Sequence, residues 1–510
     1  MGELSLISRA RSHGDRIALR ADGLEHTYAA LLDASASVAA RLLNGAADLA
    51  EARIAFLAPG GFAYLAIQWG IWRAGGIAVP LSISATPREL EHALRDSGAT
   101  LVVTLRESAA TMEFPDEIFS GSRLIYEEPG SSVARELPEI DPARRAMILY
   151  TSGTTSTPKG VVTTHACIEA QIRSLVEAWE WTADDRIPLF LPMHHVHGII
   201  NIACCALWSG ALVESFHKFD IGKILQRVAD GAYTVFMAVP TIYVKLIETL
   251  EAGVGDPDAV RNGFGSMRLM VSGSAALPAS VHEKWRILTG QSLLERYGMT
   301  ETGMIISNPL HGERRAGAVG RPLPSVQVRL KSETGEIVTG EREPGEIQVR
   351  GPIVFQGYWN RPEATTESFD GDWFRTGDVA VIEDGYYRIM GRLSVDIIKS
   401  GGYKLSALEI EAVLLDHPAI RECVVVGMKD DTWGEIVVVV AVLATGEDPL
   451  SLEQLRGWSR GRLSTYKIPS KLVILETLPR NAMGKVAKKA LIATLESSHA
   501  ITEGHQPPTG

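Results

Sequence analysis

Between about residues 28 and 105 the chain alternates between helical and strand patterns, and this alternation constrains its fold more than any other feature. Apolar residues three or four positions apart are typical of amphipathic helices, and short apolar runs are typical of buried strands. The predicted elements are helices Tyr28–Leu43, Phe62–Trp72 and Pro87–Asp96 and strands Arg53–Ala58, Ile77–Leu81 and Thr100–Leu105. Strands separated by helices of this length predict a parallel α/β sheet.

The pattern resumes later and then changes twice. Further strands are predicted at 147–150, 186–191, 234–239 and 269–272. From about 317 to 390, short strands alternate with Gly-rich turns, which predicts an antiparallel, barrel-like part. After residue 392, capping-box patterns at Ser406 and Ser451 predict two helices among three strands, which indicates a compact α+β domain.

We therefore predict two domains and a tail. The large N-terminal α/β domain is expected to span residues 1–394, with the barrel-like part at about 317–390. The small α+β domain is expected at 395–497. Residues 498–510 are polar and rich in Pro and Gly, and this composition predicts a disordered tail.

Composition excludes several classes of partner. The net charge of −11 argues against nucleic acid, which selects basic surfaces. The four cysteines lack metal-type spacing, and no apolar run approaches the roughly 18 residues that span a bilayer. We expect a cytoplasmic protein without a membrane partner, and its oligomeric state stays open. The segment Arg456–Lys489 is basic, with nine Lys/Arg against one acid, which fits either a solvated face or contact with a phosphorylated ligand.

The most informative segment runs from Tyr150 to Gly160 and reads Tyr-Thr-Ser-Gly-Thr-Thr-Ser-Thr-Pro-Lys-Gly. A loop of this composition after an apolar strand offers backbone N–H groups and hydroxyls to a phosphate chain, with Lys159 as the compensating charge. It is not a Walker A loop, because Pro158 and Gly160 flank the lysine where Gly and Ser/Thr are needed. A plain surface loop explains these residues less well.

The segment resembles the signature loop of the adenylate-forming superfamily, which includes acyl-CoA synthetases, carrier-protein adenylation domains and luciferases. The signature usually has Gly where this chain has Ser156, so we expect the loop to work and leave the effect of Ser156 on ATP affinity open. Other family motifs follow in order: Ser272–Ala276, Arg296–Glu301, Phe374–Asp378, Gly391-Arg392, Ser400–Glu409 and Pro479–Lys485. The resemblance covers nearly the whole chain and implies ATP, Mg²⁺ and CoA as ligands.

The resemblance also assigns residues to ATP and to the first reaction step. It implies that Tyr297 stacks on adenine, that Thr300 contacts the α-phosphate and that Glu301 holds Mg²⁺, which takes few protein oxygens. Lys485 is the implied adenylation lysine, whose charge can bridge the substrate carboxylate and the α-phosphate. The residues expected to bind ATP or AMP are Thr151, Ser152, Gly153, Thr154, Thr155, Lys159, Gly273, Ser274, Ala275, Tyr297, Gly298, Asp378 and Arg392.

For the second reaction step, the resemblance implies that the small domain rotates. The hinge is expected within Ser394, Val395 and Asp396, without a choice among the three. The residues expected to line the tunnel for the CoA thiol arm are Ser400, Gly401, Gly402, Tyr403 and Trp433.

Arg296 is the residue that bears on which acid is used. Many fatty-acyl and aryl relatives have Gly at this place. An Arg fills the space that a long chain would use and offers a two-pronged ligand for a carboxylate, so it favours a short dicarboxylate. The alternative is that Arg296 pairs internally with Glu295 or another acid. The residues expected to contact the acid are Arg296, His197, Met299 and Ser272.

Within the superfamily, the segments 194–198, 270–278, 295–301 and 395–411 most resemble malonyl-CoA synthetases, ligases of fatty acid metabolism. This implies that malonate or methylmalonate is joined to AMP and passed to CoA, with release of pyrophosphate and AMP. One methyl group changes binding by only about 1–3 kcal/mol, so the two acids are not separated. The alternatives are a short-chain fatty acyl-CoA ligase, an enzyme that loads a carrier protein, and a non-catalytic nucleotide-binding relative.

Overall fold

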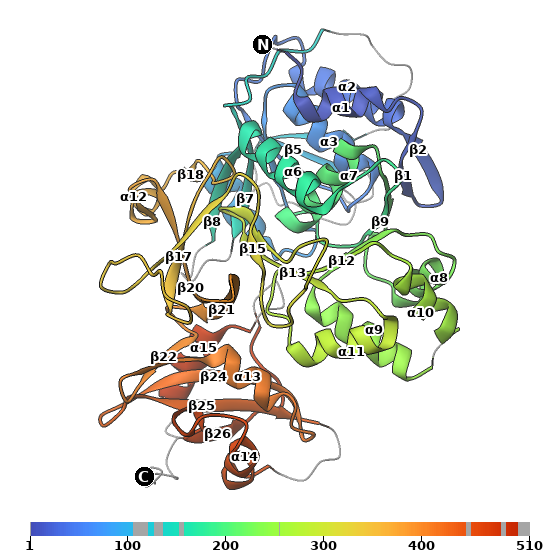
Figure 1. Ribbon diagram of the computed structural model, residues 1–510. Helices are drawn as coiled ribbons and strands as arrows, with labels where there is room; N and C mark the ends of the chain where they lie inside the picture. Colours follow the sequence, from blue (N-terminus) through green and yellow to red (C-terminus); the bar gives the residue numbers. More distant parts are fainter. Residues whose placement is uncertain are drawn as a thin grey trace. The chain divides into compact units, whose positions relative to one another are not determined.

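The computed structural model describes residues 2–105, 121–126, 136–151, 158–253, 256–444, 450–480 and 486–497 (Figure 1). By compactness, the larger unit comprises Met1–Leu277, Val281–Val328 and Val349–Phe374, and the smaller unit comprises Pro278–Ser280, Arg329–Gln348 and Arg375–Gly510. The predicted boundary at residue 394 concerns domain movement, which a division by compactness does not test, so it stays a prediction. The predicted disordered tail lies outside the described residues.

The larger unit contains a seven-stranded sheet in the order β18-β8-β7-β4-β3-β5-β6. Its strands are β3 (Arg53–Leu57), β4 (Ile77–Pro80), β5 (Leu101–Leu105), β6 (Ser122–Tyr126), β7 (Arg145–Thr151), β8 (Lys159–Thr164) and β18 (Gly357–Tyr358). Strands β3 to β7 run parallel, whereas β8 is antiparallel to β7 and β18 is antiparallel to β8. The predicted parallel sheet is confirmed, and β8 is a strand that the sequence analysis missed.

Helices α2 (Tyr28–Leu43), α3 (Phe62–Arg73) and α4 (Pro87–Ser97) form where the periodicity predicts them. Helix α4 begins at a Thr86–Glu89 capping box and ends at Gly98, whose φ of +62° suits glycine. Its apolar residues pack with Ala55 of β3 and Val79 of β4 in one buried cluster. The helix is therefore held by burial of one face as well as by its caps.

Two further sheets lie in the larger unit, in the orders β2-β1-β10-β9 and β11-β12-β13-β14-β15. Their strands are β1 (Ile17–Ala21), β2 (Leu24–Thr27), β9 (Arg186–Leu189), β10 (Leu212–Ser215), β11 (Val235–Ala238), β12 (Leu269–Ser272), β13 (Leu294–Met299), β14 (Gly303–Ser307) and β15 (Arg321–Pro322). Strands β11, β12 and β13 are parallel, so their carboxyl ends meet at one edge of the sheet, the usual place for a ligand in α/β folds.

The remaining helices of this part are α1 (Ser5–Ser12), α6 (His165–Trp179), the π-helix η1 (His197–Cys204), α7 (Cys205–Ser209), α8 (Ile221–Ala229), α9 (Pro240–Glu251), α10 (Pro257–Gly265), α11 (Ala279–Thr289) and α12 (Pro362–Glu367). Figure 1 shows helices α9 and α11 close to β12. Aromatic contacts fasten α9, α10 and α11 to one another and to Phe236 of β11, in the same sheet as β12. Tyr243 of α9 contacts Phe236 and Trp285 and donates its hydroxyl to the Val271 carbonyl at 2.9 Å. These contacts fix the strand that leads into the predicted site.

The Gly-rich region folds as a further sheet in the order β16-β17-β20-β19, with β21 paired to β20. Its strands are β16 (Gln327–Lys331), β17 (Gly345–Arg350), β19 (Phe369–Asp370), β20 (Trp373–Glu383) and β21 (Tyr386–Arg392). The pairings of β20 with β19 and β21 are antiparallel, as the sequence predicts for this region. The division between the two units passes through β16, β17 and β20.

The smaller unit contains a sheet in the order β23-β22-β25-β24, with β26 parallel to β25. Its elements are β22 (Ile397–Ser400), β23 (Tyr403–Ser406), α13 (Ala407–Leu414), β24 (Ile420–Asp430), β25 (Gly434–Leu443), α14 (Leu452–Ser459), the 3₁₀ turn η2 (Thr465–Lys467), β26 (Lys471–Ile474) and α15 (Lys488–Ser497). The long β24–β25 hairpin is buried on both faces, because alternate valines belong to two separate clusters. Ser406 and Ser451 cap α13 and α14 as predicted.

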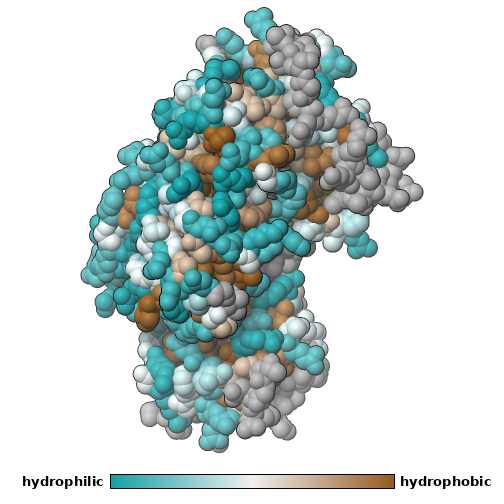
Figure 2. All heavy atoms as spheres, turned by 90° about the vertical axis from the view of Figure 1, so that its right-hand side faces the viewer, coloured by the Kyte–Doolittle hydropathy of each residue, from teal (hydrophilic) through white to brown (hydrophobic). Residues whose placement is uncertain are grey.

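The surface carries few large apolar side chains. On the face drawn in Figure 2, hydrophobic residues lie in small groups among hydrophilic ones. Within the described ranges, no helix is long and apolar enough to cross a membrane. Cys204, Cys205 and Cys423 are buried, Cys167 is partly buried, and all four are free thiols.

Candidate active site

Arg296 lies on β13 and is buried, with 3% of its surface exposed. Its guanidinium covers Gly273, where an added Cβ would lie 2.5 Å from the Arg296 Cζ atom. Nη2 donates to Ser274 Oγ at 3.5 Å, and the buried Nε has no hydrogen-bond partner. Burial lowers the pKa of Arg296 to about 10, which still leaves the side chain charged at neutral pH. Glycine at 273 is thus required for this arrangement.

Ser274 connects Arg296 to His197. Its Oγ is 3.2 Å from His197 Nδ1, and its φ of +71° places this exposed residue in the left-handed region. Burial, with the charges of Arg296 and His195, lowers the pKa of His197 well below its usual value, so the imidazole is neutral. His197 begins the π-helix η1, a rare helix form that is frequent at functional sites. A fixed cation, a hydroxyl and a neutral imidazole therefore meet at the ends of β12 and β13.

Glu295 does not neutralise Arg296. Its Oε1 accepts the Leu277 N–H at 3.1 Å, and its Oε2 is buried without a hydrogen-bond partner. Adjacent strand residues point to opposite faces, which separates the two side chains. Burial raises the pKa of Glu295 to about 8, so the carboxyl is mostly uncharged at neutral pH. In the described part of the chain, no acidic side chain forms an ion pair with Arg296.

Glu301 and Lys159 both contact Tyr358. The Tyr358 hydroxyl donates to Glu301 Oε1 at 2.9 Å, and Lys159 Nζ lies 4.9 Å from the centre of the Tyr358 ring. Glu301 is buried, and its backbone carbonyl accepts the Phe355 N–H at 2.8 Å. The end of the predicted phosphate loop and the predicted Mg²⁺ ligand are thus brought together. The described residues include no group of three or more possible metal ligands. A single glutamate suits Mg²⁺, which takes few protein oxygens and shares the rest of its shell with phosphates and water.

The other predicted residues of the larger unit lie on β7, β12 and β13 or in the turns that follow them. Tyr297 and Gly298 form a bulge in the β13–β14 pairing, where a side chain at 298 would meet the Gly303 carbonyl. Thr300 lies in the turn that follows, Met299 packs beside a small aromatic cluster, and the hydroxyl of Ser272 is buried without a partner. Thr151 pairs with Lys159 across β7 and β8, and Ala275 is exposed next to Ser274.

In the smaller unit, Asp378 and Arg392 face each other across β20 and β21, with Arg392 Nε 3.0 Å from Asp378 Oδ1. These two residues, both expected to bind ATP or AMP, are therefore adjacent. The Arg392 N–H also donates to Asp396 Oδ2 at 2.9 Å. Gly391 has a φ of +121°, and an added Cβ there would lie 2.3 Å from the Asp396 Cβ. This close approach requires glycine.

Asp396, one of the three predicted hinge residues, is held by a lysine that the sequence analysis missed. Lys488 Nζ lies 2.6 Å from Asp396 Oδ1 and 2.7 Å from Glu411 Oε1. Burial alone would lower the pKa of Lys488, but the charges of Glu411 and Asp396 raise it. Ser394 and Val395 precede this buried cluster in a short turn.

The predicted CoA residues gather on one surface of the smaller unit. Gly401 donates its N–H to the Trp433 carbonyl at 2.9 Å and is covered by the Trp433 ring. Tyr403 stacks on Tyr466, with ring centres 4.5 Å apart and planes inclined by 4°. All three aromatic side chains are exposed. Ser400 and Gly402 flank Gly401 in the same loop. Tyr466, which stacks on Tyr403, lies in the basic segment and was not among the predicted residues.

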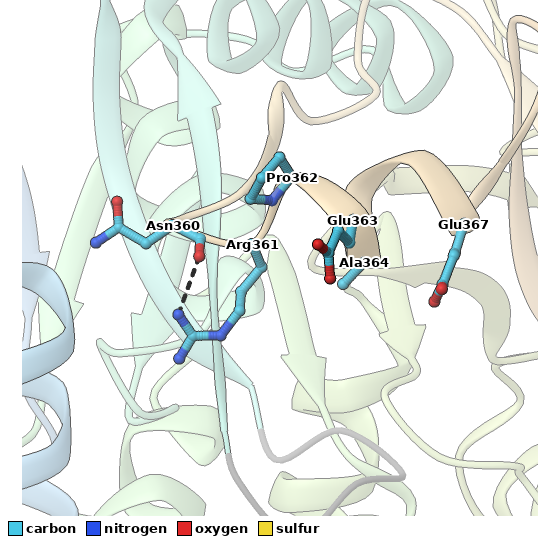
Figure 3. A pocket seen from close by; sticks show the side chains of 6 residues that line it. All are labelled: Asn360, Arg361, Pro362, Glu363, Ala364 and Glu367. Carbon is cyan, nitrogen blue, oxygen red and sulfur yellow. Dashed lines mark hydrogen bonds between the residues drawn. The ribbon is translucent and has the colours of Figure 1, made fainter.

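The predicted residues Ser152, Gly153, Thr154, Thr155 and Lys485 lie outside the described residues, as does Ser156. A surface hollow at α12, drawn in Figure 3, is lined by Asn360, Arg361, Pro362, Glu363, Ala364 and Glu367. None of these belongs to the predicted site, so we assign the hollow no role.

Comparison with known proteins identifies the family. The profile of the AMP-binding enzyme family matches residues 6–359, and that of the AMP-binding enzyme C-terminal domain matches residues 409–485. This chain belongs to the AMP-binding enzymes. The family and the fold class predicted from the sequence are both confirmed.

Among relatives of this AMP-binding enzyme, malonate–CoA ligase ACSF3, mitochondrial, of Mus musculus is 43% identical over 98% of this chain and 91% of the relative. The structure of ATP-bound MatB from Rhodopseudomonas palustris superimposes with a TM-score of 0.86 at 32% identity, over 98% of this chain and 99% of that one. A malonyl-CoA ligase in a ternary product complex with methylmalonyl-CoA and AMP has a TM-score of 0.69 at 37% identity, over 94% and 100%.

Proposed function

We propose that this AMP-binding enzyme is a malonyl-CoA synthetase, which joins malonate to AMP and transfers the malonyl group to CoA. The observation that carries the proposal is the buried, charged Arg296 beside Ser274 and His197. The three relatives described above are named for malonate, malonyl-CoA or MatB, which supports the same substrate class.

The energetics of Arg296 favour an anionic substrate group. A charge taken out of water is costly unless a partner compensates it. Within the described residues, the hydrogen-bond partner of Arg296 is the Ser274 hydroxyl, which carries no charge, and the nearby His197 imidazole is neutral. A substrate carboxylate bound by the guanidinium would supply the missing charge with two parallel hydrogen bonds. A monocarboxylate uses its only carboxylate for activation and has none left for Arg296. Malonate has a second carboxylate, and this would account for a buried arginine at position 296.

The first half-reaction is attack of the free malonate carboxylate oxygen on the α-phosphorus of ATP, which breaks the bond to the pyrophosphate oxygen. Lys159 would balance the charge of the phosphate chain, and Lys485 would balance the charge of the α-phosphate and the attacking carboxylate. Glu301, held by Tyr358, would bind Mg²⁺, which neutralises phosphate charge when it is bound. Tyr297, Asp378 and Arg392 would bind the nucleoside.

In the second half-reaction, the CoA thiol loses its proton and its sulfur attacks the malonyl carbonyl carbon, and AMP leaves. The exposed loop from Ser400 to Tyr403, with Trp433 and Tyr466, offers aromatic faces and backbone N–H groups to the thiol arm and nucleotide of CoA. A rotation about the segment 394–396 would exchange this loop for Lys485.

A panel of acids tests the proposal. ATP–pyrophosphate exchange would be measured with malonate, methylmalonate, succinate, acetate and octanoate, followed by detection of the CoA thioester. We expect malonate to give the highest kcat/KM, with methylmalonate within about 200-fold of it, since one methyl group separates them. A preference for acetate would support a short-chain fatty acyl-CoA ligase instead. Exchange without thioester formation would support a carrier-protein substrate.

The predicted cytoplasmic location stays a prediction. The Mus musculus relative is named as a mitochondrial protein. Fractionation of cells that express the tagged chain, with compartment markers assayed in parallel, would decide it.

A further inference from the structure

Two adjacent residues of β13 hold the same turn from its two ends. The turn, residues 273–277, follows β12 and carries Ser274. Arg296 covers its beginning at Gly273 and donates to Ser274 Oγ at 3.5 Å. Glu295 holds its end, because its Oε1 accepts the Leu277 N–H at 3.1 Å. One side chain reaches each end because neighbouring strand residues project from opposite faces.

The turn needs such an anchor because its middle is weakly supported. Ser274 has a φ of +71°, a region that side chains other than glycine rarely adopt. The residues from Ser274 to 276 are exposed and gain little from packing, whereas Leu277 is buried. The Leu277 N–H is thus the point where the buried scaffold meets the exposed turn.

Glu295 is itself fixed. Its backbone carbonyl accepts both the N–H and the side-chain Nδ2 of Asn308, each at 3.0 Å. Its backbone is in register with Ser272 on β12. The side chain is 5% exposed, and its second oxygen has no hydrogen-bond partner. A buried polar oxygen without a partner is costly to the folded state, so its presence here calls for a specific explanation.

We infer that Glu295 is a positioning residue for acid selection: by holding Leu277, it keeps the Ser274 hydroxyl between His197 and Arg296. This inference rests on the proposed function, since it concerns how the second carboxylate of the substrate is recognised. Glu295 acts through hydrogen-bond acceptance by its carboxyl oxygen, a task that needs no negative charge.

The test compares Glu295→Met, which removes the acceptor, with Glu295→Gln, which keeps an acceptor oxygen. Glu283→Gln, an exposed change on the following helix α11, is the matched control. We expect Glu295→Met to lower kcat/KM for malonate by about tenfold, the effect of one lost hydrogen bond, mainly through KM, and to affect acetate less. Glu295→Gln should restore most of the malonate preference. Equal losses with both acids, or a Gln variant as poor as Met, would overturn the inference.

Two further measurements keep the inference testable whatever acid the enzyme prefers. In an Arg296→Met background, Glu295→Met should lower kcat/KM for malonate by less than about a further twofold, because substitutions at residues that act together do not have additive effects. Fully multiplicative losses would overturn the inference. Amide hydrogen exchange in the 273–277 turn should accelerate in Glu295→Met at an unchanged Tm. If wild type prefers a monocarboxylate, the proposed function fails, while these two results still judge Glu295 separately.

Discussion

Replacing Arg296 by methionine should abolish the preference for a dicarboxylate while sparing the fold. Methionine fills similar space without charge. The second carboxylate of malonate would then face a serine hydroxyl and a neutral imidazole in a site that is closed to water on the Arg296 side. Leaving a buried charge without its partner costs about 2–5 kcal/mol. That corresponds to a loss of about 30- to 4,000-fold in kcat/KM for malonate.

The same reasoning predicts the opposite effect on stability. Arg296 is a buried cation with no acidic partner in the described chain, so its removal relieves a desolvation cost in the free enzyme. We expect the Tm of Arg296→Met to equal or exceed that of wild type. Malonate should raise the Tm of wild type by binding to the folded state, but not that of the variant.

The assay is ATP–pyrophosphate exchange with malonate and acetate, supplemented by Tm measurements with and without each acid. Arg296→Gly is the companion variant, because it removes the charge and also opens space for a longer chain. Acetate use should change far less than malonate use in Arg296→Met, because acetate has no second carboxylate for the guanidinium to bind. Equal losses with malonate and acetate would refute the carboxylate role of Arg296.

Three other changes probe the remaining parts of the account. Lys485→Ala should nearly abolish adenylate formation but preserve thioester formation from supplied malonyl-adenylate; equal loss of both half-reactions would contradict its role. Lys488→Met should lower the free energy of unfolding by about 3–5 kcal/mol, as measured in urea, because it leaves the carboxylates of Asp396 and Glu411 without their cation. Lys489→Met, at an exposed position, is the control. Equal losses of stability in the two variants would contradict the role of Lys488. Gly273→Ala should raise the KM for malonate, because its Cβ would displace the Arg296 guanidinium; an unchanged KM would contradict that packing.

Most of the larger unit was predictable because its signals are local. Periodicity located helices such as Tyr28–Leu43, and cap residues such as Ser451 marked where others begin. Strand β8 was missed because its residues, Lys159–Thr164, continue a polar loop without an apolar run before Val161. Sequence periodicity reflects only the local order of apolar and polar residues. A short strand beside a polar loop has a composition similar to that of the loop, so it is not distinguished.

The motif residues of the site could be predicted from the sequence, but the residues that position them through hydrogen bonds and ion pairs could not. Sequence left open whether Arg296 pairs with Glu295, and the alternation of side chains along β13 answers this in the structure. Tyr358 and Lys488 were missed because each acts on a partner far away in the sequence, Glu301 and Asp396 respectively. Nothing local distinguishes such residues from ordinary surface or core positions.

A competition experiment tests the central claim most directly. The enzyme would be given ATP, Mg²⁺, CoA and equal concentrations of malonate, acetate and octanoate, with the thioesters and nucleotides identified by mass spectrometry. The account predicts malonyl-CoA as the main thioester, formed in step with AMP. Acetyl-CoA or octanoyl-CoA as the main product, or ADP in place of AMP, would contradict it.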